Sequence, residues 1–264
     1  MALPGRGDTF SALPFWQNGP SPGAFYNFPN IRPTPDTNTF QRSKAPITTA
    51  TSVLGVIYNG GVAIAADILG SYGSLARYRN CPRVMKVNNN IILGAGGDYA
   101  DFQYLRNVVE EKIIDEECLD DGFTLKPKSL YCWLTRVLYN RRSRFDPFWN
   151  NFIVAGIQDG HPFLGTVDKL GTAFEDKHIA TGYGAYMALP LLRSAVEEKG
   201  ELGLSRDEAK ALLVRCLEIL FYRDARSFPK YNIATVDIAD GVIVEGPFEL
   251  THNWEIGNMI KGPE

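Results

Sequence analysis

The sequence predicts an α+β fold in which two antiparallel sheets pack face to face and pairs of helices cover both outer faces. Apolar runs of strand length come in pairs joined by short turns, which is typical of antiparallel sheets. Segments with helical periodicity also come in pairs, and each pair lies between two groups of strands. The order along the 264 residues is strands, two helices, strands, two helices, strands. A four-layer αββα sandwich is the arrangement that buries every apolar face.

The predicted strands are short apolar runs flanked by turn residues. The first pair is separated by Asn59-Gly60, a strong hairpin signal, and the last pair by Asp240-Gly241. A single run, at 170–174, is a possible further strand. The paired strands are expected at residues 52–58 with 61–66, 83–87 with 91–95, 152–157 with 163–167, and 231–238 with 241–245.

The predicted helices follow from apolar spacing and from end signals. The first is expected to start near Asp98 and to reach residue 117, with Asp101 favouring the positive end of the helix dipole. Apolar residues spaced by three and four predict a second helix from Leu130 to about residue 142. A third helix is expected at residues 186–198, where the apolar residues again have helical spacing. The last helix begins at Ser205, which forms a capping box with Glu208.

Composition excludes several classes of protein. The chain has 27 Lys and Arg against 30 Asp and Glu, a net charge of −3, and 45% hydrophobic residues. It is too apolar for a disordered chain, and it lacks the basic footprint expected for binding nucleic acid or an anionic membrane. No run approaches the roughly 20 apolar residues of a transmembrane helix. The four scattered cysteines favour reduced thiols, the three histidines match no metal spacing, and no cofactor is expected.

The composition also divides the chain into a tail and a body. Residues 1–46 hold eight of the 16 prolines and no periodic run. Such a stretch buries too little apolar surface to offset its ordering entropy. The tail is therefore expected to be a flexible extension, and whether it is a pro-segment depends on the family to which the body belongs. The chain is divided into residues 1–42, which the resemblance given below implies are a removable pro-segment, residues 43–250, the folded domain, and residues 251–264, a C-terminal extension.

Six strings in the body carry a family resemblance. They are TSVLGV (51–56), GVAIAADILGSYGSLAR (61–77), GDYADFQYL (97–105), RRSRFDPFWN (141–150), ATGYGAYMA (180–188) and YRDARS (222–227). With these strings the chain resembles the β subunits of the 20S proteasome, which have the N-terminal-nucleophile hydrolase fold. Three of the strings resemble one particular member, at the seventh β position of the ring.

The resemblance implies positions for the catalytic groups that active members use. An N-terminal threonine supplies both the nucleophile and the base, its own α-amine. Thr51 matches that threonine, Asp67 the aspartate of the second strand, and Gly97 the glycine of the oxyanion hole. Asp224 and Ser227 match the Asp–Ser pair that completes the hydrogen-bond network around the amine.

Three positions depart from the pattern of the active members. Arg83 replaces the lysine that lowers the pKa of the threonine hydroxyl. The planar guanidinium of arginine is bulkier than the lysine ammonium and stays protonated, so it is not a conservative replacement at a proton-transfer site. Tyr183 replaces a serine and is expected to fill the pocket beside Thr51. Ala50 replaces the glycine whose freedom assists self-cleavage. The sequence therefore predicts a non-catalytic subunit.

Ordinary structural roles stand beside the catalytic ones. Thr51 could simply enter a strand, Asp67 could bond to the following turn, and Gly97 could form a tight turn. Asp224 and Ser227 could close the last helix through local hydrogen bonds. Two other functions also stay open, namely an active threonine endopeptidase subunit with Thr51 as nucleophile, and a free-standing binding domain.

The aromatic loop with Phe145, Phe148 and Trp149 is either local core or a contact with a neighbouring subunit.

The resemblance further implies partners and processing. The partners are β subunits of the same and the opposite ring, α-ring subunits and assembly chaperones, with neither nucleic acid nor membrane, in cytoplasm and nucleus. Cleavage of the pro-segment is expected near Ser43, upstream of Thr51. The C-terminal extension carries four large apolar residues expected to contact the opposite ring: Trp254, Ile256, Met259 and Ile260.

Overall fold

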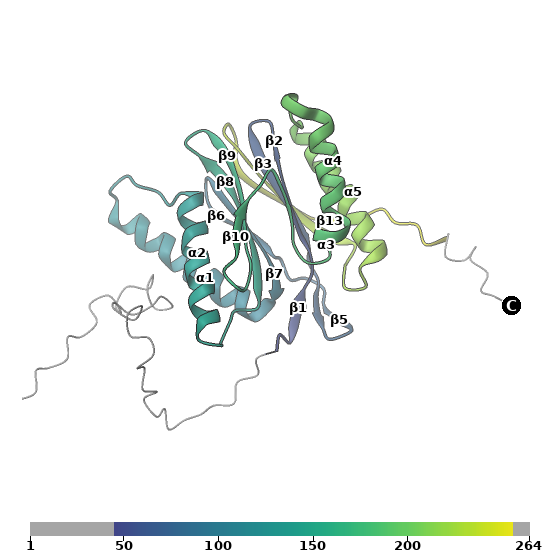
Figure 1. Ribbon diagram of the computed structural model, residues 1–264, viewed down its shortest axis with the longest axis horizontal. Coiled ribbons are helices and arrows are strands. Elements are labelled where there is room, and N and C mark those ends of the chain that lie inside the picture. The colour runs from purple at the N-terminus through teal and green to yellow at the C-terminus, as the bar shows by residue number, and fades with distance from the viewer. Residues whose placement is uncertain (1–44, 256–264) are drawn as a thin grey trace, which may run out of the picture.

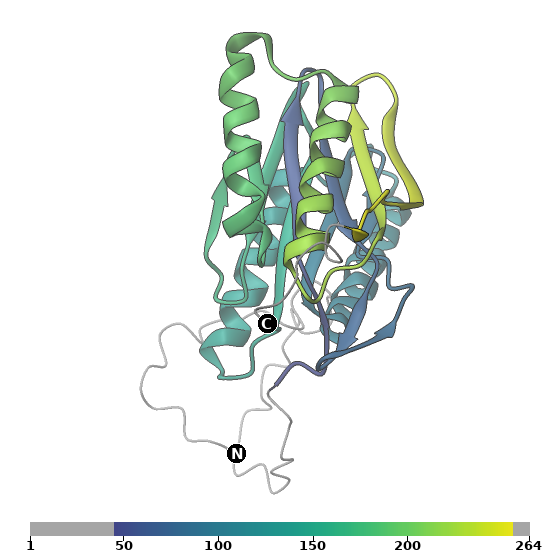
Figure 2. The same cartoon turned by 90° about the vertical axis from the view of Figure 1, so that its right-hand side faces the viewer.

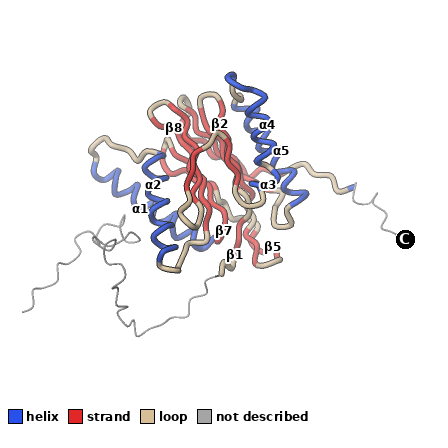
Figure 3. The backbone as a smooth tube through the Cα atoms, in the orientation of Figure 1, coloured by secondary structure: helices blue, strands red, loops and turns tan. Residues whose placement is uncertain are grey.

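Two antiparallel sheets form the centre of the molecule. The computed structural model describes residues 45–255, and Figure 1 shows the sheets between two groups of helices. In the eight-stranded sheet the order is β10-β9-β8-β7-β1-β4-β5, and β6 also pairs with β7. In the five-stranded sheet the order is β11-β2-β3-β12-β13. The predicted four-layer αββα sandwich is therefore confirmed, and Figure 3 shows its strands between the helices.

The strands of the eight-stranded sheet come from the first two thirds of the chain. They are β1 (Thr48–Ala50), β4 (Gly70–Tyr72), β5 (Leu75–Tyr78), β6 (Val84–Asn88), β7 (Ile91–Asp98), β8 (Asn150–Gln158), β9 (His161–Val167) and β10 (Ala173–Glu175).

The five-stranded sheet joins the first hairpin to the last one. Its strands are β2 (Val53–Tyr58), β3 (Gly61–Asp67), β11 (His178–Ala180), β12 (Lys230–Asp237) and β13 (Gly241–Glu249).

The helices begin and end at the signals that the sequence carries. Helix α1 (Tyr99–Leu119) has Asp98 as its N-cap, and α2 (Pro127–Ser143) has proline in its first turn. Helix α5 (Arg206–Arg223) begins with the predicted capping box. The helix predicted at 186–198 is two helices, α3 (Gly184–Met187) and α4 (Leu189–Lys199). They are followed by a short 3₁₀ turn, Gly200–Leu202.

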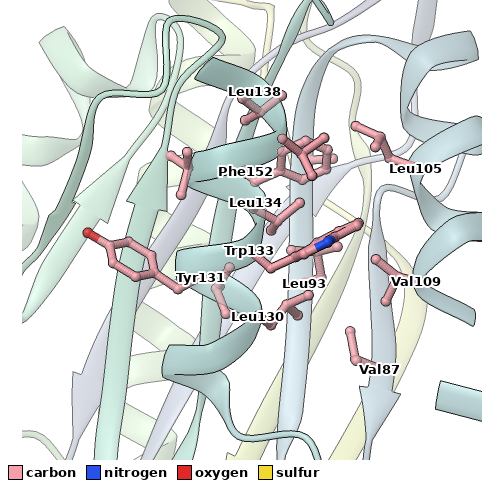
Figure 4. Packing of buried hydrophobic residues seen from close by; sticks show 14 of the residues in the cluster. Val87, Leu93, Leu105, Val109, Leu130, Tyr131, Trp133, Leu134, Leu138 and Phe152 are labelled. Atoms are coloured by element: carbon pink, nitrogen blue, oxygen red, sulfur yellow. The ribbon is translucent and has the colours of Figure 1, made fainter. Parts of the chain in front are cut away.

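Each helix pair packs its apolar side chains against one sheet. Helices α1 and α2 cover the eight-stranded sheet, and α4 and α5 cover the five-stranded one. Figure 2 shows the second helix pair face-on, in front of the strands that it covers. Figure 4 shows the first interface, where Leu130, Trp133 and Leu134 of α2 meet Leu93 and Phe152 of the sheet. Burying each such side chain stabilises the folded state by about 1.5–3 kcal/mol relative to leaving it exposed.

A third apolar cluster lies between the two sheets. It brings Val53 and Ile64 of the five-stranded sheet against Ile92, Ile153 and Leu164 of the eight-stranded sheet. Because this layer is dry and continuous, the two sheets are held at a fixed spacing. The candidate site lies at one end of this layer, where the chain passes from one sheet to the other.

Candidate functional site

Thr51 lies at the crossing between the two sheets. The preceding strand, β1, belongs to the eight-stranded sheet, where it pairs with β4 on one side and β7 on the other. The register places Thr49 beside Ser71 and Ala50 beside Gly97. At Thr51 the chain leaves this sheet and enters β2 of the other. Residues 48–50 are therefore an integral part of the sheet in the described chain.

Arg83 lies beneath Thr51 and is 1% exposed. Its Nε donates to the Asp67 carbonyl oxygen at 3.0 Å, and its Nη1 donates to the carbonyl oxygens of Thr51 at 2.7 Å and Ala95 at 3.2 Å. Its Nη2 donates to the Ser52 carbonyl oxygen at 3.0 Å and to the Asp67 carboxylate. All five N–H groups of the guanidinium are thus used. Arg83 joins segments of both sheets.

Asp67 ends β3 and is the anionic partner of Arg83. Its second carboxylate oxygen accepts a hydrogen bond from the Phe228 N–H at 3.0 Å. Burial raises the pKa of the Asp67 carboxyl, and the Arg83 guanidinium opposes that rise. The pair is closed off by protein on all sides, so its role is to hold backbone segments together beneath the cavity.

The Thr51 hydroxyl contacts the Asp224 carboxylate directly. Asp224 is the C-cap of α5, and its own N–H donates to the Leu220 carbonyl oxygen at 2.7 Å. Ser227 turns the other way, because its hydroxyl bonds the carbonyl oxygens of Leu220 at 3.1 Å and Asp224 at 2.7 Å. The structure therefore brings Asp224 to Thr51, whereas Ser227 closes the end of the helix.

A cavity of about 260 Å³ opens beside Thr51. Gly97, Tyr183, Asp224 and Arg226 are among the residues that line it. Tyr183, which is expected to fill the pocket beside Thr51, is one of the residues that line the cavity and is 57% exposed. Tyr183 is the N-cap residue of the short helix α3.

Gly97 occupies a position that only glycine tolerates. Its φ is +94°, and a Cβ atom there would come within 1.9 Å of the Trp149 carbonyl oxygen. The tight approach lets β7 pair with Ala50 on one side and Asn150 on the other. A structural reason for this glycine therefore exists beside the oxyanion role that the resemblance implies.

Three polar residues of the cavity were not singled out by the sequence analysis. Thr181 accepts the Val53 N–H at 3.0 Å through its hydroxyl, and Asn151 and Arg226 line the cavity. Thr181 and Arg226 lie within the ATGYGAYMA and YRDARS strings, so the motifs contained the signal. In residues 45–255, no group of three His, Cys, Asp or Glu side chains is arranged to hold a metal ion.

Trp254 is the last aromatic residue that the structure describes. Its ring packs edge-on against Phe221 at 5.8 Å and Tyr222 at 5.1 Å between centroids, yet it stays 53% exposed. The Tyr222 hydroxyl also accepts the Asn253 N–H at 2.7 Å. The extension thus begins against α5. Ser43, Ile256, Met259 and Ile260 lie outside the described residues.

No helix within residues 45–255 is both long and apolar enough to cross a membrane.

Comparisons with known proteins agree over most of the chain. The family model described as "Proteasome subunit" matches residues 47–236. The chain is 52% identical to proteasome subunit beta type-4 of Xenopus laevis over 246 residues, which cover 93% of this chain and 98% of that protein. It is 44% identical to the Drosophila melanogaster subunit of the same name, over 95% of this chain and 97% of that protein. A Saccharomyces cerevisiae relative, proteasome subunit beta type-7, is 37% identical over 88% of this chain and 89% of its own.

The match spans both sheets, both helix pairs and the residues around the cavity. The chain belongs to the proteasome subunit family.

Proposed function

We propose that the chain is a non-catalytic subunit of the 20S proteasome core particle, in its β ring. There it supports assembly of the particle and the ATP- and ubiquitin-dependent protein degradation that the particle performs. The observation that carries the proposal is the environment of Arg83. All five of its N–H groups are committed to carbonyl oxygens and to Asp67, so none is directed at the Thr51 hydroxyl. A guanidinium also stays protonated and transfers no proton.

The position of Thr51 in the chain supports the same proposal. Thr51 directly follows β1, a strand that pairs with β4 on one side and with β7 on the other. Freeing the α-amine of Thr51 would remove that strand. The self-attack that releases a threonine is also disfavoured by the methyl group of Ala50.

The experiment is covalent labelling of purified particles with an electrophilic probe selective for N-terminal threonine. We expect labelled catalytic subunits and an unlabelled chain. The variant Arg83→Lys, Tyr183→Ser, Ala50→Gly serves as a comparison, because it restores all three residue types that active members carry. Labelling of Thr51 in the native chain would contradict the proposal.

An active threonine endopeptidase is the alternative. The contact between the Thr51 hydroxyl and Asp224, together with the open cavity, favours it. The labelling experiment separates the two functions directly.

We further propose that residues 1–42 are removed by neighbouring active subunits, at a bond near Ser43. The support is again β1, since a cut there leaves residues 48–50 in the sheet. N-terminal sequencing of the chain from purified particles is the test. We expect a first residue close to Ser43, whereas a chain starting at Thr51 would contradict both this cut and the non-catalytic role.

We assign residues 251–264 to contacts with the opposite β ring. Trp254 is a suitable anchor, because an exposed tryptophan of this kind often dominates an interface. Deleting residues 253–264 should leave the fold intact and slow the dimerisation of half-particles. Trp254 also contacts α5 of its own domain, so the extension could instead stabilise that domain. A truncated chain that dimerises normally but melts at a lower temperature would show that the extension serves its own domain.

The proposed partners are β subunits of both rings, α-ring subunits and assembly chaperones, without nucleic acid or membrane, in cytoplasm and nucleus. Native mass measurement distinguishes a subunit of the ring from a free-standing binding domain. A ring subunit should occur within a very large complex, and a pool containing only monomer would exclude that assignment.

A further inference from the structure

Phe145 is an exposed phenylalanine with a strained backbone. It lies in the loop between α2 and β8, the residue is 80% exposed, and its φ is +55°. A bulky residue in the left-handed region raises the energy of the folded chain, and such strain is often found at functional positions. The rest of the aromatic loop behaves differently, because Phe148 is buried in the core.

Hydrogen bonds on both sides of Phe145 hold the loop in this conformation. The Phe145 N–H donates to the Arg142 carbonyl oxygen at 3.0 Å. Arg141 donates through Nε to the Asp146 carbonyl oxygen at 2.8 Å and through Nη2 to its carboxylate at 2.9 Å. The same guanidinium lies 4.3 Å from the centre of the Phe148 ring. The ring of Phe145 is therefore presented to solvent by a preorganised loop, which lowers the entropy lost when it docks.

The loop itself carries an excess of positive charge. Between residues 141 and 149 there are three arginines and one aspartate, and the aspartate is paired with Arg141. The guanidinium of Arg142 lies 5.6 Å from the Tyr139 ring, and the ammonium of Lys169 lies 3.9 Å from the Trp149 ring. An exposed apolar ring on a loop with a net positive charge is complementary to an apolar socket bordered by carboxylates.

We propose that Phe145 is a docking anchor that inserts into an acidic-rimmed apolar socket on another subunit of the particle. The inference rests on the proposed function, because it takes the partner to be a proteasome subunit. An aromatic anchor on a rigid loop is the kind of residue that dominates an interface. The left-handed conformation of Phe145 also ends α2, because the N–H groups of Phe145 and Asp146 donate to the carbonyl oxygens of Arg142 and Arg141.

The first experiment competes variants against the wild-type chain for incorporation into particles. Phe145→Gly relieves the left-handed strain and removes the ring together. We expect the urea midpoint of the free chain to rise, while its share in purified particles falls about tenfold or more. A merely structural residue would shift both readouts in the same direction. The control is Phe123→Gly, which removes a 78% exposed ring from a loop beside Asp121 and should compete within twofold of wild type.

The second experiment identifies the partner with a photo-crosslinking benzoylphenylalanine at position 145 in assembled particles. A crosslink to an Asp- and Glu-rich peptide of another subunit supports the proposal. A crosslink to residues 1–44 of the same chain, no crosslink, or normal competition by Phe145→Gly would overturn it. If the wild-type chain itself fails to enter particles, the proposed function fails instead.

Discussion

Replacing Arg83 with methionine tests whether the buried guanidinium holds the two sheets together. The substitution keeps most of the side-chain volume but removes five donated hydrogen bonds and leaves the Asp67 carboxyl without its cation. Breaking a buried ion pair from one side costs about 3–5 kcal/mol. Each buried acceptor left unpaired adds about 1–3 kcal/mol before relaxation. A loss of at least 3 kcal/mol is expected, against a total stability of about 5–15 kcal/mol.

Urea unfolding followed by tryptophan fluorescence measures this loss. The double variant Arg83→Met, Asp67→Asn should recover about 1–3 kcal/mol, because it no longer contains an unpaired buried carboxylate. The matched control is Arg106→Met, which breaks an exposed ion pair with Glu110 and should cost about 0.5 kcal/mol or less.

The same variant has an expected pH dependence. Burial already raises the pKa of the Asp67 carboxyl, and the Arg83 guanidinium opposes that rise. Removing Arg83 therefore raises the pKa of Asp67 in the folded state further. A folded-state pKa above the unfolded value means that the contribution to stability is present at low pH and is lost as pH rises. The deficit of Arg83→Met should therefore be smaller near pH 5 than near pH 8. A deficit below about 1 kcal/mol, independent of pH, would refute the reasoning.

Four further predictions concern stability and thiol reactivity. Gly97→Ala should cost about 3 kcal/mol or more in urea unfolding, because its Cβ would overlap a backbone carbonyl; a neutral result would mean that β7 can shift. Ser205→Ala should cost about 1 kcal/mol through the lost helix cap, and an unchanged midpoint would contradict this. The Lys199 ammonium lowers the pKa of Glu208 to about 2, so stability should fall as pH drops from 4.5 toward 2 and Glu208→Gln should reduce that fall. Exposed Cys118 should react with maleimide at neutral pH, whereas Cys216, whose pKa burial raises to about 11, should react only on unfolding; equal rates would exclude this burial.

The long elements of the fold were predictable because their signals are local. The turn at Asn59-Gly60, the cap at Asp98 and the capping box at Ser205 each specify an element from a few neighbouring residues. The strands β1, β4, β5 and β11 were missed. They contain three or four residues and owe their conformation to distant partners, as when Thr49 pairs with both Ser71 and Asp98. No local pattern encodes such pairing.

The site was predictable in membership and unpredictable in geometry. The motifs named Thr51, Asp67, Arg83 and Asp224, and the structure brings all four to one end of the sandwich. What Arg83 does there depends on the carbonyl oxygens that the end of β3, the link between β1 and β2, and β7 present to it. How far Tyr183 is exposed depends on the backbone around the start of α3. Neither property can be inferred from residue type.

The three residues of β1 also decide how the β4–β5 hairpin is attached. Within the described residues, β4 pairs only with β1 and with β5, so the β4–β5 hairpin is joined to β7 only through residues 48–50. A chain shortened to Thr51 would leave β4 with an open edge and the hairpin without its pairing to the sheet. Open edges are sites of aggregation. Imprecise processing of the N-terminus would thus produce a subunit with an exposed edge strand, which quality control could distinguish from a correctly matured one.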